Sequence, residues 1–135
     1  MKISTLLVLY LLITNIYFSF CQNKDYSVFE HIFKYVKGLN KMKRIAVAGA
    51  DHLSSLITFR KIKDLGIADF ILIGPQERID KIAEENNIDI SDFEIIDKKN
   101  DEEIALHAAK LVKQRVADIY FKGGLNPIVV LKINF

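Results

Sequence analysis

The chain has 135 residues, of which 50% are hydrophobic, and its 19 Lys and Arg against 17 Asp and Glu give a formal net charge of +2. This near balance excludes the strongly basic surface typical of nucleic-acid-binding proteins, and the hydrophobic content excludes a disordered chain. The single cysteine, Cys21, excludes an internal disulfide and a zinc site built from several thiolates, and we expect no metal ion.

Residues 1–25 form a hydrophobic leader. The run from Ile3 to Cys21 carries no charged residue. As a helix, its length would come close to the roughly 30 Å thickness of the hydrocarbon core of a bilayer. Lys2 and the apolar residues after it also fit a signal peptide, although the run ends without the small residues of a cleavage site. A membrane anchor, a signal and an extended reading frame without a role are therefore three open alternatives. The later lysines favour a domain on the cytoplasmic side, tethered if the leader is an anchor.

The residues after the leader alternate helices with strands. Ser27 and Glu30 have the spacing of a capping box, which predicts a helix that ends at Gly38. A buried strand follows at 44–50, because this run is apolar, does not alternate and is too short for a helix. Asp51 is the expected N-cap of the next helix, which Gly66 ends. We expect its inward-facing residues to be Leu53, Leu56, Ile57 and Leu65.

Two further strand–helix pairs and a last strand complete the pattern. A second strand is expected at 69–73, and Pro75 fits the first turn of a helix that Asn86 and Asn87 stop. A third strand at 93–96 precedes a helix capped by Asn100, and a fourth strand is expected at 118–121. The buried residues of these two helices are expected to be Ile79, Ile82 and Ala83, then Ile104, Ala105, Ala108, Leu111 and Val112.

Short connections between these elements predict an α/β fold, a parallel sheet with right-handed crossovers and helices on both faces. Such sheets bind ligands outside the carboxyl ends of their strands, which points to three segments, 49–55, 74–77 and 122–126. Neither the GxxxxGK[ST] nor the GxGxxG phosphate-binding signature is present.

Five residues at two of these strand ends are candidate binding residues. Gly49, Asp51 and His52 place a small residue, a carboxylate and an imidazole where helix N–H groups attract anions. The alternative is a plain N-cap at Asp51 with an exposed His52 beside it. Lys122 before Gly123 allows an ammonium and the backbone to approach a phosphate together, and a simple loop lysine is the alternative.

Four ordered segments resemble those of a known family. They are KRIAVAGA at 43–50, DLGIADFILIG at 64–74, IDISDFEIID at 88–97 and ADIYFKG at 117–123. Over about residues 26–123 the chain resembles the phosphate butyryltransferase and phosphate acetyltransferase family. The resemblance implies transfer of a short acyl group between coenzyme A and orthophosphate, with no bound cofactor. It also implies the two-domain α/β fold of isocitrate and isopropylmalate dehydrogenases, of which this chain holds the amino-terminal part.

The resemblance ends near the last predicted strand. Lys122 and Gly123 match the family's strand-end Met-Lys-Gly stretch, whereas the tail at 125–135 departs from it and contains no predicted capped helix. We therefore expect a partial acyltransferase domain at 26–124 that is inactive alone, with its catalytic residues unidentified. The alternative is a non-catalytic, membrane-tethered α/β module that binds phosphate or CoA. An exposed sheet edge also leaves a homo-oligomer open.

Overall fold

The computed structural model describes residues 27–38 and 42–133. The chain forms two compact units, residues 1–35 and 36–135, and the predicted leader lies outside the described residues. Helix α2 (Ser27–Lys37) confirms the first predicted helix. Within the described ranges, no helix combines the length and the apolar character needed to cross a membrane.

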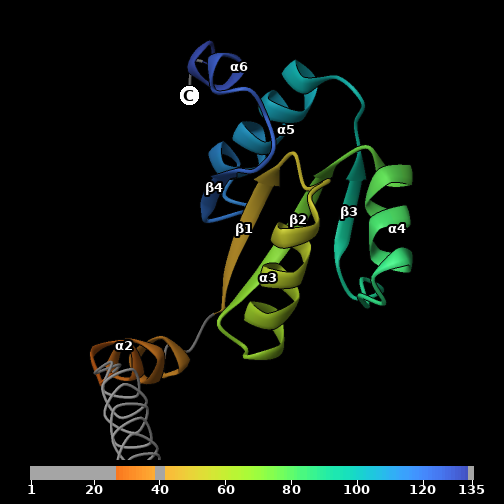
Figure 1. Ribbon diagram of the computed structural model, residues 1–135. Coiled ribbons are helices and arrows are strands. Elements are labelled where there is room, and N and C mark those ends of the chain that lie inside the picture. Colours follow the sequence, from red (N-terminus) through yellow and green to blue (C-terminus); the bar gives the residue numbers. More distant parts are fainter. Residues whose placement is uncertain (1–26, 39–41, 134–135) are drawn as a thin grey trace, which may run out of the picture. The chain divides into compact units, whose positions relative to one another are not determined.

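The second unit is built on a sheet of four parallel strands (Figure 1). Their order across the sheet is β3-β2-β1-β4, and all four confirm predicted strands. Ala48 at the end of β1 lies between Ile73 of β2 and Lys122 of β4, so these strands end at one edge. The strands are β1 (Lys43–Ala48), β2 (Ala68–Gly74), β3 (Glu94–Asp97) and β4 (Ile119–Lys122).

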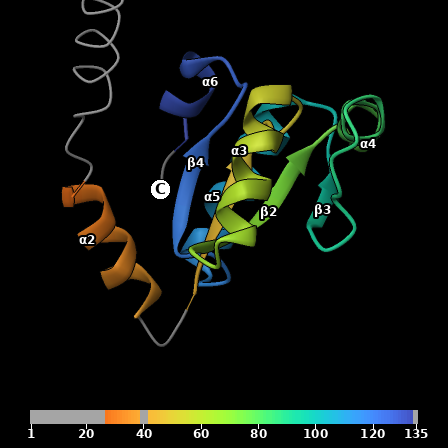
Figure 2. The same ribbon diagram turned by 60° about the horizontal axis from the view of Figure 1, so that its bottom comes forward.

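Helices cover both faces of this sheet, as predicted. Figure 2 shows α3 in front of the strands and α5 behind them. Val47 and Leu72 belong to the core beneath α3 and α4, whereas their neighbours Ala48 and Ile73 belong to the core beneath α5 and α6. This alternation explains why β1 and β2 are continuously apolar. The helices are α3 (Leu53–Asp64), α4 (Gln76–Glu85), α5 (Asp101–Lys113) and α6 (Pro127–Leu131).

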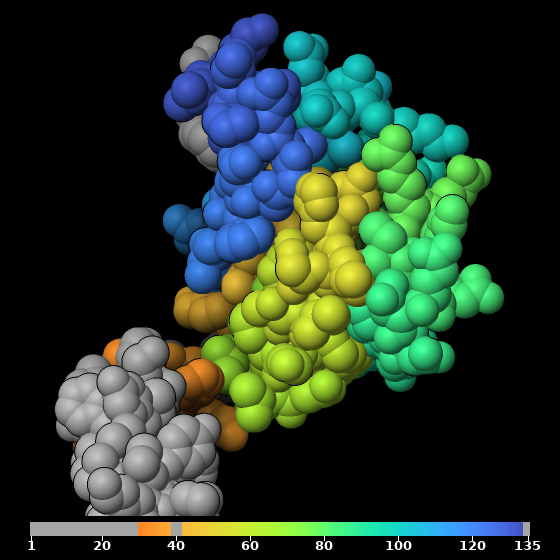
Figure 3. Space-filling model, in the orientation of Figure 1, coloured from red at the N-terminus to blue at the C-terminus, as the bar shows by residue number. Residues whose placement is uncertain are grey.

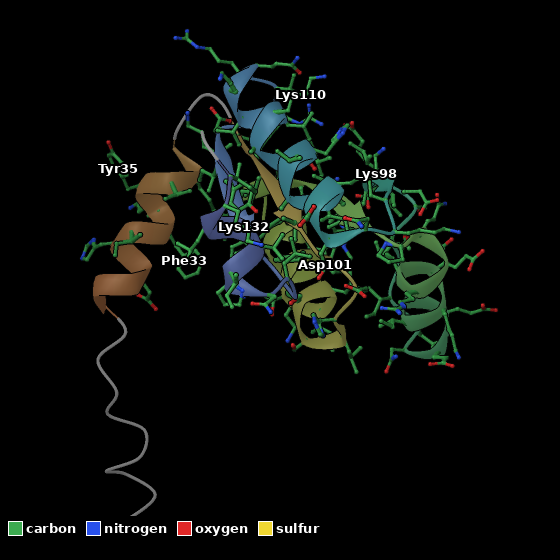
Figure 4. All side chains as sticks on the ribbon, turned by 90° about the horizontal axis from the view of Figure 1, so that it is seen from above. Phe33, Tyr35, Lys98, Asp101, Lys110 and Lys132 are labelled. Carbon is green, nitrogen blue, oxygen red and sulfur yellow. The ribbon has the colours of Figure 1, made fainter. Side chains whose placement is uncertain are left out.

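Helix α5 begins and ends as its sequence predicts. The Asn100 side chain accepts hydrogen bonds from the N–H groups of Glu102 at 2.8 Å and Glu103 at 3.3 Å. Figure 4 shows Asp101 and Lys110 toward opposite ends of the helix. An acidic first turn and a basic last turn both complement the helix dipole. The helix buries Ile104, Ala105, Ala108 and Leu111, as expected, and Ala109 as well, whereas the predicted Val112 is only partly buried.

The inward face of α3 differs from the prediction. The buried residues are Leu56 and Phe59, while Leu53, Ile57 and Leu65 are 40%, 38% and 47% exposed. Ile57 is rotated about 100° from Leu56 around the helix axis, and Leu65 is the C-cap residue beyond the last turn. The fully buried positions of α3 are therefore the two in its middle, and Ile62 packs partly buried against the same core.

The tail contains a capped helix that the sequence analysis missed. The Asn126 side chain accepts a hydrogen bond from the Ile128 N–H at 3.0 Å, and Pro127 occupies the first turn of α6. An N-cap followed by proline is a recognised helix start, so this signal was present in the sequence. Val129 and Val130 pack against the core beneath α5, which ties the tail to the domain.

Candidate functional site

A cleft of about 470 Å³ opens at the carboxyl edge of the sheet. Loops that follow all four strands line it, as the rule for open α/β sheets predicts. In Figure 3 the yellow residues after β1 lie between the blue loop after β4 and green α4. The lining residues are Asp51, His52, Pro75, Gln76, Glu77, Arg78, Lys99, Asp101, Ile104, Gly124 and Leu125.

The loops after β1 and β4 are joined through three glycines. The Gly123 N–H donates to the Ala48 carbonyl oxygen, and the Gly124 N–H donates to the Gly49 carbonyl oxygen, both at 2.8 Å. Gly49 has a φ of +82°, which L side chains rarely adopt. A Cβ atom at Gly123 would overlap the Gly49 carbonyl oxygen. The sequence predicted that residues 49 and 123 share one edge, and this contact confirms it.

His52 lies against the β4 loop at the cleft wall. A Cβ atom at Gly124 would overlap the Nε2 and Cδ2 atoms of the imidazole. The backbone of His52 occupies the N-cap position of α3, but its side chain makes no capping hydrogen bond. The exposed imidazole therefore faces the cleft from a position that a glycine keeps open.

Asp51 does not cap α3, contrary to the prediction. The helix begins one residue later than that role requires, and the Asp51 carboxylate instead forms an ion pair with Arg78 at 3.1 Å. Asp51 is mostly buried, whereas Arg78 at the start of α4 is 72% exposed. This pair joins the loop after β1 to the helix after β2 across the cleft.

The amino-terminal turn of α3 is left without a side-chain cap. Among the described residues, no hydrogen-bond acceptor is found for the first-turn N–H groups of residues 53–55. By contrast, Asp97 accepts the Gln76 N–H at the start of α4 at 3.0 Å, and Asn100 caps α5. The free N–H groups and the helix dipole give this side of the cleft a partial positive charge.

The family model described as "Phosphate acetyl/butaryl transferase" matches residues 27–127. The chain belongs to the phosphate acetyl/butaryl transferase family. It is 38% identical over 104 residues to a phosphate butyryltransferase of Clostridium acetobutylicum, a match that covers 77% of this chain and 34% of the relative. It is 36% identical over 90 residues to a phosphate butyryltransferase of Clostridium beijerinckii, a match that covers 67% of this chain and 30% of the relative. A phosphate acetyltransferase of Rickettsia felis is 30% identical over 89 residues, which are 66% of this chain and 25% of that relative.

The chain therefore spans between a quarter and a third of the length of these curated family members. The aligned family region includes the whole sheet and all the loops that line the cleft. The part shared with these relatives thus contains the four-stranded sheet and the loops at its carboxyl edge.

The side chain of Lys122, a predicted binding residue, points toward the loop that follows it. Its Nζ atom donates to the Leu125 carbonyl oxygen at 2.8 Å, and neither Lys122 nor Gly123 lines the cleft. Leu125, which does line it, is only 4% exposed. In this structure Lys122 and Gly123 support the loop that forms one wall of the cleft.

Sequence reasoning missed the contribution of the loop after β3. Lys99 and Asp101 line the cleft, although only the ends of the other three strands had been considered. The signal was present, because the same strand-end rule applies to β3 and the Asn100 cap marks the helix start beside it. Arg78 was missed as well, since its role depends on an ion pair with a residue from another loop.

A second depression of about 550 Å³ lies between α3 and the residues before β3, and it shares no lining residue with the cleft. Its Arg60 guanidinium donates to the carboxylates of Asp64 and Asp92. The hydrogen bond from Arg60 holds the pKa of Asp92 below its ordinary value, and hydrogen bonds from Ser91 lower the pKa of Asp89. These charged groups pair with one another, so we interpret the ion pairs in this depression as structural links between α3 and the residues before β3.

Proposed function

We propose that this chain binds the substrates of a phosphate acyltransferase, a short acyl-CoA and orthophosphate, at the carboxyl-edge cleft. The observation that carries the proposal is the family match over residues 27–127, which contains every loop that lines the cleft. Two relatives are named phosphate butyryltransferase, so a butyryl group is the first acyl group to test.

Orthophosphate is assigned to the amino-terminal turn of α3. Uncapped N–H groups at residues 53–55 and the positive end of the helix dipole favour an anion there. Lys99 adds a full positive charge to the same cleft. The glycine backbone at Gly49 and Gly124 brings the loop after β4 close to this turn. Lys122 and Gly123 act on the phosphate indirectly, by holding that loop.

The acyl thioester is assigned to the apolar floor of the cleft. Ile104 and Leu125 line the cleft beside its polar wall and make this part of the lining apolar, although each is almost fully buried. When orthophosphate attacks the thioester carbonyl carbon, a C–O bond forms and the C–S bond breaks. His52 is proposed to accept the proton of the attacking phosphate hydroxyl and to return it to the departing sulfur.

Binding is proposed to occur without turnover in this chain alone. The relatives named for acyl transfer are about three times as long as the region they share with it. The described cleft is open on one side, and a second set of groups is needed to exclude water and to hold the pantetheine arm. The chain is thus proposed to act as the substrate-binding part of an acyltransferase.

Calorimetric titration of the full chain with orthophosphate, butyryl phosphate, CoA and butyryl-CoA tests this proposal. We expect saturable binding that Lys99→Gln weakens several-fold. Lys110→Gln is the control, because it removes an exposed lysine of α5 that does not line the cleft, and it should leave binding unchanged. If none of the four compounds binds, the proposed function is wrong. Formation of butyryl phosphate by the chain would overturn the proposed lack of turnover while supporting the site.

A further inference from the structure

Lys99 is the one lysine of the described residues that lines the carboxyl-edge cleft. It lies in the loop after β3, immediately before the Asn100 cap of α5, and shares the lining with Asp101 and Ile104. Figure 4 shows Asp101 at the start of α5 and Lys110 farther along the same helix. Other lysines line depressions elsewhere on the domain, namely Lys61, Lys98, Lys110 and Lys132.

Within residues 27–38 and 42–133, no group holds the exposed Lys99 side chain in place, because its ammonium forms no ion pair and donates no hydrogen bond there. Lys98 instead pairs with Glu103 at 3.7 Å, and Lys122 donates to the Leu125 carbonyl oxygen at 2.8 Å. A lysine stem is flexible, so an untethered Nζ atom can follow a ligand through a cleft that the residue lines. Lys99 can therefore reach a ligand bound in the cleft.

The size of the cleft keeps Lys99 close to the reactive part of such a ligand. The cleft has a volume of about 470 Å³, which is typical of a site for one small molecule. The proposed function assigns phosphate to the first turn of α3 and the acyl chain to the lining near Ile104 and Leu125. Ile104 lies in the second turn of the helix that Lys99 precedes, so the assigned acyl position and this lysine share one end of α5.

We propose that Lys99 is a modification site, which is butyrylated by butyryl phosphate bound in the chain's own cleft; this inference rests on the proposed function, because binding at the cleft delivers the acyl group. The neutral Nζ atom attacks the acyl carbonyl carbon, an amide C–N bond forms, and the C–O bond to the phosphate breaks. Orthophosphate leaves with the electron pair of that bond. Of the two protons that the lysine ammonium loses on becoming an amide, one passes to the leaving phosphate and one to solvent.

Butyrylation of Lys99 changes the cleft that directs it. Acylation removes the positive charge of the lysine, and the cleft then offers an anion only backbone N–H groups and the partly paired Arg78 on these loops. The butyryl amide also occupies space in the cleft. The modified chain should therefore bind orthophosphate several-fold more weakly than the unmodified chain. A high concentration of acyl phosphate thus reduces binding at its own site.

Incubation of the full chain with butyryl phosphate, followed by peptide mass spectrometry, tests the proposal. Lys110 is the internal comparison, because it is exposed and does not line the cleft. We expect the initial rate of butyrylation at Lys99 to be at least about tenfold the rate at Lys110, because binding places the acyl group beside Lys99. This rate should saturate with butyryl phosphate and fall when orthophosphate competes for the cleft. Butyric anhydride, which carries the same acyl group without a phosphate, should modify the two lysines at similar rates.

The outcomes separate this inference from the proposed function. Similar rates at Lys99 and Lys110 with butyryl phosphate, or an equal preference for Lys99 with the anhydride, would overturn the modification site. Calorimetric titration tests the proposed function independently. Saturable binding of butyryl phosphate without selective butyrylation would reject the modification site and retain the binding site, whereas neither binding nor selective butyrylation would reject both.

Discussion

The Gly124 N–H donates to the Gly49 carbonyl oxygen at 2.8 Å, although 75 positions in the chain separate these glycines. This bond closes the loops after β1 and β4 on each other at the cleft wall. The neighbouring Gly123 packs against the same carbonyl group. Because residue 124 has no side chain, the His52 imidazole packs directly against the loop backbone at this wall.

Gly123→Ala should destabilise the domain by about 2 kcal/mol or more, because the new Cβ atom would overlap the Gly49 carbonyl oxygen and backbone would have to move. Gly66→Ala is the control. Gly66 has a φ of +68° but nothing within 4 Å of an added Cβ, so it should lose only about 1 kcal/mol from backbone strain. Urea unfolding of both variants measures the difference. Equal losses would show that the close approach at Gly123 is not a constraint.

Gly124→Ala should separate ligand binding from stability. Its Cβ atom would overlap the imidazole of His52, an exposed side chain that can rotate away. We expect a loss of stability below about 1 kcal/mol, together with a several-fold weaker affinity for butyryl-CoA, because the imidazole leaves its place in the cleft. Urea unfolding and calorimetric titration measure the two effects. Unchanged affinity would remove His52 from the proposed site.

The sheet could be predicted because its strands are buried on both faces. The run at 44–50 and the run at 69–73 contain no alternation, and the structure shows why: Val47 and Leu72 meet one helical layer while Ala48 and Ile73 meet the other. Helix α3 was harder to predict. Its apolar residues nearly surround the axis, so only the packing itself shows that Leu56 and Phe59 face inward.

The location of the cleft could be predicted, but the side-chain pairs around it could not. The strand-end rule identified the loops that carry Gly49, His52 and Gly124. Long charged side chains select partners that only the fold brings near. Lys122 reaches a carbonyl three residues later, and Arg78 reaches Asp51 from 27 residues away. No local pattern in the sequence distinguishes these two outcomes.

Asn100→Ala should destabilise the domain by about 1 kcal/mol. The Asn100 side chain satisfies the N–H groups of Glu102 and Glu103, and alanine leaves both without that acceptor. Asn100→Asp should retain most of the stability, because a carboxylate accepts the same bonds and suits the helix dipole. Thermal unfolding followed by circular dichroism measures both variants. A loss as large in Asn100→Asp as in Asn100→Ala would contradict a capping role.

Acid should weaken the ion pair between Arg60 and Asp92. The hydrogen bond from Arg60 lowers the pKa of Asp92 in the folded chain below its value of about 4 in the unfolded chain. A lowered folded-state pKa contributes stability that is complete above pH 4 and is lost as the pH falls through the folded-state pKa. The wild-type chain should therefore exceed Asp92→Asn in free energy of unfolding at neutral pH, and this difference should shrink below about pH 4. Urea unfolding from pH 7 downward measures it. In an Arg60→Gln background the difference should be small at every pH, whereas an unchanged pH dependence there would exclude Arg60 as its cause.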